Sequence, residues 1–255
     1  MVMSLALRKD GILTEKLSLI MSSKIVEGMV FWAHKTVEMF LKKLIPYSFV
    51  LVLISCSQER IEELPFYNSP DFTPHFLTMA QAELSITHKI PEFTLQNQFE
   101  DSFISSKNDK KIQIANFIFT TCADICPNMT SNMKFVEKAF FNDSLIEILS
   151  FSVTPWIDNP KKLFDYAEFY DIKTNNWFFL TGKKSKIYNL ARKSYFAEED
   201  FGHSRDSTIF LHTEHFILVD QNRKIRGIYN GTLELETQQL IKDITVLKES
   251  LQSLN

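Results

Sequence analysis

The sequence predicts an α/β protein in which helices flank a central mixed sheet. Three observations support this fold class. Short apolar runs rich in β-branched and aromatic residues recur from residue 112 onward, longer segments of helical periodicity lie between them, and only a short polar turn separates the last two runs. Strands that alternate with helices pair in parallel, whereas a closing hairpin adds antiparallel strands.

The first strand is predicted at Ile112 to Phe119, where the run IQIANFIF is apolar enough to be buried on both faces. It leads directly into a loop with two cysteines, and Pro127 follows them. Proline suits the first turn of a helix, because its missing N–H would have no partner there. A second strand is predicted after this helix, at Ser144 to Val153.

The same alternation continues in the second half of the chain. Asp158 and Pro160 start a helix that runs through Tyr170, and Trp177 to Leu180 is a third strand. Helical periodicity follows at Lys184 to Tyr195. The helices would therefore cover a sheet built from the apolar runs.

A hairpin and a last helix complete the predicted domain. Strands at His212 to Asp220 and Ile225 to Tyr229 are joined by the turn QNRK, and an amphipathic helix follows at Leu233 to Leu251. This order of elements is that of thioredoxin. The sequence thus predicts a thioredoxin-like fold.

Composition and charge argue against one class of partner. The chain has 255 residues, a formal net charge of -3, and lysines that are scattered along its length. Nucleic-acid binding calls for a basic stripe or patch, which is not visible here. Nucleic acid is therefore not an expected partner.

The segment from Met39 to Cys56, MFLKKLIPYSFVLVLISC, predicts an export signal. Two lysines precede a mostly apolar stretch at Leu44 to Ile54, which has the length of a signal-peptide core and is short for a membrane span. The residues LISC before and at Cys56 resemble the bacterial lipobox, so Cys56 is expected to carry lipid after cleavage. The expected product is an exported lipoprotein, anchored to the membrane and facing the periplasm or cell exterior. An uncleaved membrane helix is the alternative.

These signals divide the chain into four expected parts. Residues 1–38 are an upstream extension or an overextended start, because Met39 with its two following lysines is the better start for a signal. Residues 39–55 form the lipoprotein-type signal, and residues 56–82, polar and rich in proline, form a spacer behind the lipid anchor. Residues 83–255 form the thioredoxin-like domain.

The cysteine loop, TTCADICPNMT, is the strongest chemical signal. Cys122 and Cys126 are three residues apart, and the one other cysteine is Cys56. A structural disulfide, a redox couple and a soft-metal site are the three possible uses of such a pair. Cys126 would lie at a helix N-terminus, where the helix dipole is expected to lower its thiol pKa. Two thiolates would select Cu(I), zinc or an iron–sulfur cluster.

Histidines could complete a metal site. His203, His212 and His215 follow the cysteines, and the last two are three residues apart on one predicted strand, so at most one of them points at the cysteines. Two cysteines and one histidine suit Cu(I), and Cu(II) could bind with an added ligand. From these residues alone, a structural disulfide in an exported protein is supported at least as well.

Several motifs together resemble the Sco (SenC) family, thioredoxin-like copper proteins of cytochrome c oxidase assembly. The resemblance runs from about Leu64 to the C-terminus and rests on CxxxCP at 122–127, SVTPWIDNP at 152–160, WFFLTG at 177–182 and HTEHFILVD at 212–220. The chain departs from the family at Thr154, where the usual residue is acidic, and at Leu211, where many relatives have Asp.

The resemblance implies a membrane-tethered metallochaperone that binds copper, as Cu(I) or Cu(II), through Cys122, Cys126 and His212. It is His212, and not His215, that aligns with the family's distal histidine. The implied partner is the copper-site subunit of cytochrome c oxidase, which carries the binuclear copper site, or another copper chaperone. Some relatives act instead as thiol reductants, so a thiol–disulfide oxidoreductase that uses the Cys122–Cys126 pair is the alternative.

Overall fold

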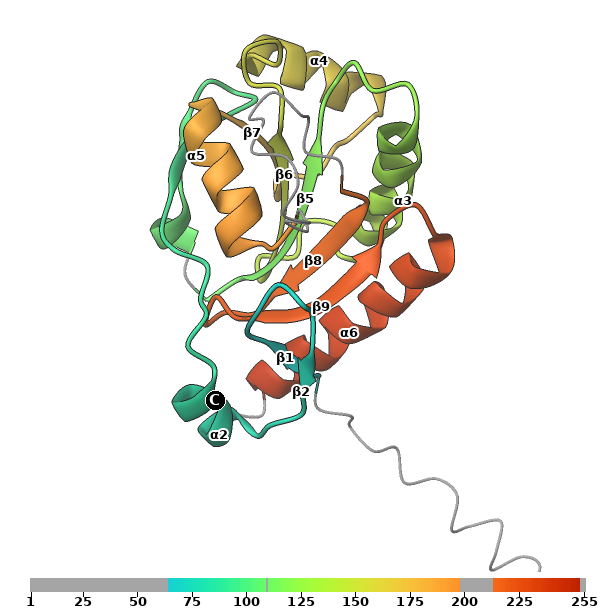
Figure 1. Cartoon of the computed structure of the whole chain (residues 1–255). Coiled ribbons are helices and arrows are strands. Elements are labelled where there is room, and N and C mark those ends of the chain that lie inside the picture. Colours follow the sequence, from blue (N-terminus) through green and yellow to red (C-terminus); the bar gives the residue numbers. More distant parts are fainter. Residues whose placement is uncertain (1–63, 109, 198–212, 253–255) are drawn as a thin grey trace, which may run out of the picture. The chain divides into compact units, whose positions relative to one another are not determined.

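In the described part of the chain, nine strands form a central mixed sheet, and helices cover both of its faces (Figure 1). The structure, a computed structural model, describes residues 64–108, 110–197 and 213–252. All of them belong to one compact unit, Ile61–Asn255. The predicted fold class, a thioredoxin-like mixed sheet flanked by helices, is confirmed.

The middle of the sheet is parallel. It consists of β5 (Ile112–Ile118), β6 (Ile146–Ser152) and β7 (Trp177–Thr181). Every residue of β5 and β6 is buried, because both faces of these strands are covered. These are the three strands that the apolar runs predicted.

The predicted hairpin lies beside β5. It consists of β8 (His215–Val219), which pairs antiparallel with β5, and β9 (Ile225–Asn230). The predicted first strand starts at His212, but residues 198–212 lie outside the described part of the chain. Thr213 and Glu214 are described and lie before the strand, so β8 starts at His215, later than predicted.

Four short strands extend the sheet at its two edges and were not predicted. On one side, β3 (Thr94–Asn97) pairs antiparallel with β7 and with β4 (Ser102–Ile104). On the other side, β1 (Phe66–Tyr67) pairs antiparallel with β9 and with β2 (Pro74–His75). The complete order is β2-β1-β9-β8-β5-β6-β7-β3-β4.

Helices pack on the sheet in two groups. The helices α3 (Ile125–Ala139), α4 (Pro160–Phe169) and α6 (Glu234–Gln252) contribute Met133, Leu163 and Leu240 to one core cluster. The helix α5 (Lys184–Asn189) contributes Ile187 to a second cluster, which lies on the other face of β5 and β6. Because side chains alternate along a strand, successive residues of β5 and β6 serve the two clusters in turn.

The predicted helix from Lys184 to Tyr195 is divided. Its α-helical part ends at Asn189, and Leu190–Ser194 continues as a π-helical turn in which the Tyr195 N–H donates to the Leu190 carbonyl. Tyr195 is fully buried and packs against Phe117 and Phe151. Core packing of this ring thus accompanies the wider turn.

The expected spacer, residues 56–82, belongs to the fold wherever the structure describes it. From residue 64 onward it forms β1, β2 and the start of α2 (Met79–Ser85), and Phe66 and Ala82 are fully buried. The domain start expected at residue 83 is therefore too late. The prolines and polar residues that indicate a spacer are equally compatible with edge strands and turns.

Arg226, on β9, holds the beginning of this segment. Its guanidinium donates to the carbonyls of Leu64 (2.6 Å) and Pro65 (3.1 Å), and it lies 3.8 Å from the centre of the Phe66 ring. The same guanidinium pairs with the buried carboxylate of Asp220 at 3.2 Å. The segment thus supplies hydrogen-bond acceptors to a buried guanidinium whose charge is balanced by Asp220.

A second buried cation, Lys224, holds α2. The side chain is 1% exposed, and its ammonium group donates to the Ala82 carbonyl (2.9 Å) and to the Glu83 carboxylate (2.8 Å). An ammonium ion without partners would be costly at this depth. The N-terminal segment is therefore held by hydrogen bonds from two buried cations as well as by its apolar contacts.

A fragment that starts at residue 83 is expected to be less stable than one that starts at residue 61. The difference should be about 3–5 kcal/mol, because the shorter fragment loses the buried Phe66 ring and the carbonyls to which Arg226 and Lys224 donate. Urea unfolding followed by circular dichroism measures it. Glu92→Gln, which removes the exposed ion pair with Arg223, serves as a control and should change stability by less than about 1 kcal/mol. Equal stability of the two fragments would contradict this account of the segment.

Candidate metal centre

The two cysteines lie where a parallel strand ends and a helix begins. Cys122 is in the loop that joins β5 to α3, and Cys126 is in the first turn of α3. At this edge β6 ends beside β5, and the Val153 N–H donates to the Ile118 carbonyl over 2.8 Å. The carboxyl ends of parallel strands are the usual place for functional sites in α/β proteins.

The structure brings the two predicted thiols together as free cysteines. The Cys126 N–H donates to the Cys122 Sγ over 3.5 Å, and the Cys122 N–H donates to the Phe119 carbonyl over 3.2 Å. Cys122 is half-buried, whereas Cys126 is 2% exposed and belongs to the core under α3. Solvent and a partner molecule can therefore reach Cys122 more readily than Cys126.

The predicted low pKa for Cys126 is wrong. The pKa of its thiol is raised from 9.0 to about 12, mainly by burial. A backbone hydrogen bond with Phe119 lowers the pKa, and the nearby Cys122 and Asp158 act in the same direction as burial. The prediction considered the dipole of α3, but the side chain of Cys126 turns into the core. The loss of hydration there outweighs the dipole.

A buried carboxyl group is bonded to the start of the thiol loop. The Asp158 carboxyl accepts hydrogen bonds from the N–H (3.2 Å) and hydroxyl (2.5 Å) of Thr120. It also accepts from the hydroxyls of Ser152 (2.7 Å) and Thr154 (2.9 Å). The sequence predicted Asp158 only as a helix start. The hydroxyl residues before it in SVTPWIDNP were the available signal for a hydrogen-bonded cluster.

The remaining predicted site residues are not all described. His212 and Cys56 lie outside the described residues, as does His203. His215 is half-buried at the start of β8, with its ring edge-on to Phe72 at 5.7 Å between centres. Within residues 64–108, 110–197 and 213–252, no group of three or more His, Cys, Asp or Glu side chains could hold a metal ion. The third predicted ligand thus stays a prediction.

The arrangement of the thiols supports two kinds of chemistry. Two close sulfurs are soft donors that favour Cu(I) over hard cations when deprotonated. The same sulfurs can close a disulfide, because the Cys122 Sγ lies only 3.5 Å from the backbone nitrogen of Cys126. In both cases the half-buried Cys122 is the sulfur that an incoming thiol or metal carrier would meet first.

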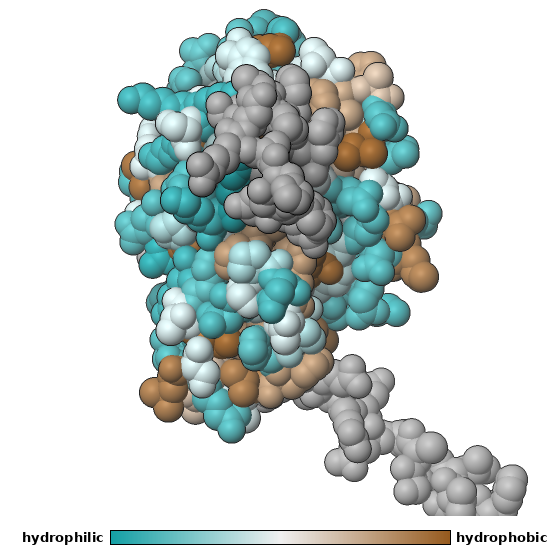
Figure 2. Space-filling model, viewed as in Figure 1, coloured by the Kyte–Doolittle hydropathy of each residue, from teal (hydrophilic) through white to brown (hydrophobic). Residues whose placement is uncertain are grey.

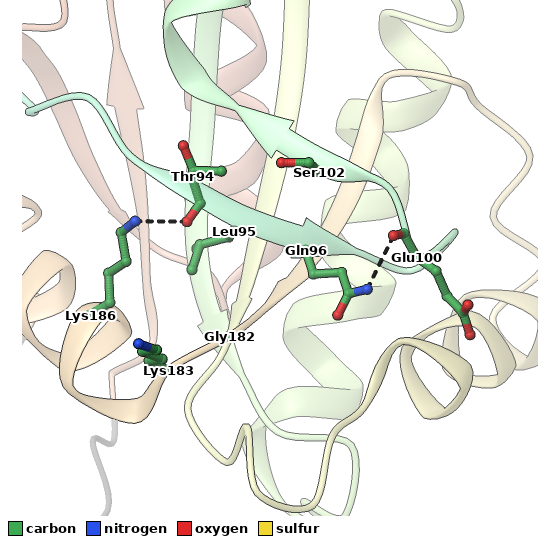
Figure 3. Close-up of a pocket in the computed structure, with 8 residues that line it drawn as sticks. All are labelled: Thr94, Leu95, Gln96, Glu100, Ser102, Gly182, Lys183 and Lys186. Atoms are coloured by element: carbon green, nitrogen blue, oxygen red, sulfur yellow. Dashed lines mark hydrogen bonds between the residues drawn. The ribbon is translucent and has the colours of Figure 1, made fainter.

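A separate open groove of about 460 Å³ carries no thiol (Figure 3). It is lined by Thr94, Leu95, Gln96, Glu100, Ser102, Gly182, Lys183 and Lys186. The ammonium group of Lys186 donates to the Thr94 carbonyl over 2.9 Å, and the Gln96 amide donates to the Glu100 carbonyl over 3.1 Å. Sulfur and imidazole are absent from this lining, so the groove does not compete with the cysteine loop for a soft metal.

The face in Figure 2 is largely polar, with apolar residues in separate places between polar ones. Among the exposed apolar side chains of the described residues are Phe76, Leu84, Trp156 and Phe169. No helix in the described ranges is long and apolar enough to cross a bilayer.

The fold and the loop together define a class, the thioredoxin-like proteins with a CxxxC pair between a buried strand and a helix. A comparison with protein families is more specific. The SCO1/SenC family model matches residues 81–249, and the chain belongs to this family. The predicted resemblance is thereby confirmed.

Relatives support the assignment. The SCO1 protein homolog of Bacillus subtilis is 34% identical over 161 residues, which cover 62% of this chain and 82% of that protein. The crystal structure of a SCO1/SenC family lipoprotein from Bacillus anthracis has 27% identity and a TM-score of 0.54, covering 64% of this chain and 96% of that one. BsSco, a member of the Sco family of cytochrome c oxidase assembly proteins in which a disulfide switch was identified, has 33% identity and a TM-score of 0.54, covering 63% and 93%.

Alkylation of the reduced protein is expected to modify Cys122 well before Cys126. At pH 8, a thiol with a pKa of about 12 is thiolate in only about one molecule in ten thousand, and thiolate is the reactive form. Because the pKa is raised, the rate at Cys126 should increase with pH throughout the range below pH 12. Mass spectrometry of iodoacetamide-treated Cys122→Ser and Cys126→Ser variants measures each thiol alone. Similar rates for the two variants would show that Cys126 is not protected.

Proposed function

We propose that this protein is a copper metallochaperone, which binds copper through Cys122, Cys126 and His212 and delivers it to the binuclear copper site of cytochrome c oxidase. The observation that carries the proposal is the pair of adjacent free thiols at the carboxyl end of β5, in a chain of the SCO1/SenC family. Members of this family serve in cytochrome c oxidase assembly. Copper is the cargo of the site.

The unequal burial of the thiols is suited to handing over a metal. Cys126 is held in the core, whereas Cys122 is half-buried in the loop. A thiolate of the recipient would replace one sulfur ligand at a time, and each released sulfur would take up a proton. Such ligand exchange leaves the oxidation state of copper unchanged, so it needs no additional reductant or oxidant.

The direction of β8 supports His212 as the third ligand. Because β8 runs antiparallel to β5, it begins near the edge of the sheet where β5 ends and the thiol loop starts. His212 precedes β8 by three positions in the sequence and aligns with the distal histidine of the family. An imidazole is a good partner for two thiolates in a copper site.

Copper titration of the reduced fragment that starts at residue 61 is expected to show one site for each chain. His212→Ala should weaken Cu(II) binding by about 100-fold or more, since loss of even an outer partner of a ligand costs about 10–100-fold. Optical and EPR spectra should show sulfur-to-copper charge transfer that the variant loses. His75→Ala, which changes a histidine of the edge strand β2, is the control and should bind like the parent.

Two other outcomes of the copper titration would contradict the proposed function. If the parent and His212→Ala bind Cu(II) equally well, the proposed ligand set is wrong. If neither binds tightly and the Cys122–Cys126 pair forms a readily reducible disulfide, the protein acts as a thiol–disulfide oxidoreductase on exported cysteine proteins.

We also propose that Cys56 carries a lipid anchor and that the domain is exported. The sequence LISC after an apolar run supports this, and a Bacillus anthracis relative is a SCO1/SenC family lipoprotein. The chain between residues 56 and 64 spans at most about 28 Å when fully extended. The anchor would therefore keep the domain close to the membrane surface.

Mass spectrometry of the protein isolated from bacterial membranes is expected to find a lipid-modified Cys56 as the first residue. Cys56→Ser should remove the modification and release the protein from the membrane fraction or block its processing. Cys122→Ser should leave the modification unchanged. An unmodified Cys56 that is still joined to residues 39–55 would refute the anchor and favour an uncleaved membrane helix.

A further inference from the structure

We propose that Asp158 is a positioning residue, which fixes the thiol loop through Thr120 and thereby sets the disulfide equilibrium and the metal affinity of the Cys122–Cys126 pair. The part of this proposal that concerns copper rests on the proposed function. The part that concerns the disulfide equilibrium does not.

Asp158 holds Thr120 at two points. The carboxyl group accepts the Thr120 hydroxyl at 2.5 Å and the Thr120 backbone N–H at 3.2 Å. One bond would leave the residue free to rotate, but a backbone and a side-chain bond to the same carboxyl group fix both its position and its orientation. Thr120 is two residues before Cys122, so the constraint acts directly at the base of the thiol loop.

Asp158 is itself held firmly. It is 0% exposed, its N–H donates to the Thr154 carbonyl over 2.8 Å, and its own carbonyl accepts the Thr181 hydroxyl over 2.7 Å. These bonds connect it to the turn after β6 and to the end of β7. The thiol loop is therefore fastened to the strands of the parallel sheet rather than to another loop.

The rest of the thiol loop has weaker support. Thr121, Ala123 and Asp124 are exposed, and Asp124, the residue before α3, makes no capping hydrogen bond with its side chain. The bonds of the two cysteines within the loop, to Phe119 and to each other, are local. The bonds from Thr120 to Asp158 are thus the contacts through which the sheet constrains the position of the loop.

The hydroxyl of Thr154 fits this role of Asp158. It donates to the Asp158 carboxyl over 2.9 Å, and Ser152 donates to the same oxygen over 2.7 Å. An acidic side chain at position 154, which is usual in the resembled family, would place a second carboxyl group beside Asp158 and could not donate when ionised. With threonine at position 154, the Asp158 carboxyl group therefore accepts hydrogen bonds from three hydroxyl groups, those of Thr120, Ser152 and Thr154.

A looser loop should hold the two sulfurs near each other for less of the time. Closure of the disulfide depends on that proximity, because the effective concentration of one thiol at the other falls when their relative position varies. A metal ion shared by both sulfurs depends on it in the same way. Loss of the Thr120 anchor should hence weaken both equilibria and leave the cysteines themselves intact.

The test uses three single variants of the fragment that starts at residue 61. Thr120→Val removes the hydroxyl group and keeps the shape of the side chain, whereas Thr120→Ser retains the hydroxyl group and removes only the methyl group. Thr121→Val makes the same change at the exposed neighbouring threonine. The disulfide equilibrium is measured in dithiothreitol redox buffers, Cu(II) binding by titration, and thermal stability by circular dichroism.

Thr120→Val is expected to lower the equilibrium constant for disulfide formation about tenfold, which is a rise of about 30 mV in reduction potential. It should weaken Cu(II) binding by about tenfold as well, at the lower end of the range for outer partners of metal ligands. Thr120→Ser and Thr121→Val should both stay close to the parent. If the parent binds no copper, the proposed function fails, and the disulfide equilibrium still decides the role of Asp158.

The opposite results would overturn the proposal. An unchanged disulfide equilibrium in Thr120→Val, with or without a lower melting temperature, would make the Asp158 contact purely structural. Equal shifts in Thr120→Val and Thr120→Ser would show that the hydroxyl is not the cause. Asp158→Asn, where it folds, should move the equilibrium in the same direction as Thr120→Val, and a parent-like value would likewise refute the role.

Discussion

The parallel pairing of β5 with β6 is the constraint on which the site depends. The register runs over seven residue pairs, from Ile112 opposite Ile146 to Ile118 opposite Ser152. Because the two strands run in the same direction, they end at the same edge, and the segments that follow them meet there. One segment carries the thiols and the other carries Asp158. A slip of one residue would move each side chain to the core cluster on the opposite face, so the packing of the two clusters keeps these segments in register.

This dependence explains what could be predicted from the sequence. A strand that is buried on both faces needs a nearly continuous apolar run, so the strands that position the site were visible in the sequence together with the CxxxC loop. The strands β3 and β4 were not, because four and three residues of half-exposed edge give too short a pattern. The role of Asp158 was not visible either, since its bond to Thr120 joins residues 38 positions apart. Contacts of that kind depend on how the strands pair, which no local pattern contains.

The thiol of Cys126 shows how packing changes the chemistry that a local motif predicts. A helix N-terminus favours a thiolate, but the first turn of α3 directs Cys126 into the core, and burial raises its pKa to about 12. A thiol of this kind keeps its proton at neutral pH until a metal ion or a disulfide partner displaces it. Metal ligands must be deprotonated, so binding at this site would release a proton, and affinity would rise with pH. The resting protein thus keeps one nucleophile covered while the other is partly accessible.

The N-terminal segment and the thiols occupy opposite ends of the parallel strands. Arg226 and Lys224 hold the segment near the turn between β8 and β9, and the pairing of Val219 with Gln113 puts that turn beside the beginning of β5. The thiol loop begins where β5 ends, about 20 Å farther along at about 3.3 Å per residue. Exchange of a metal ion or a disulfide at Cys122 could therefore occur while Leu64 and Pro65 stay bonded to Arg226.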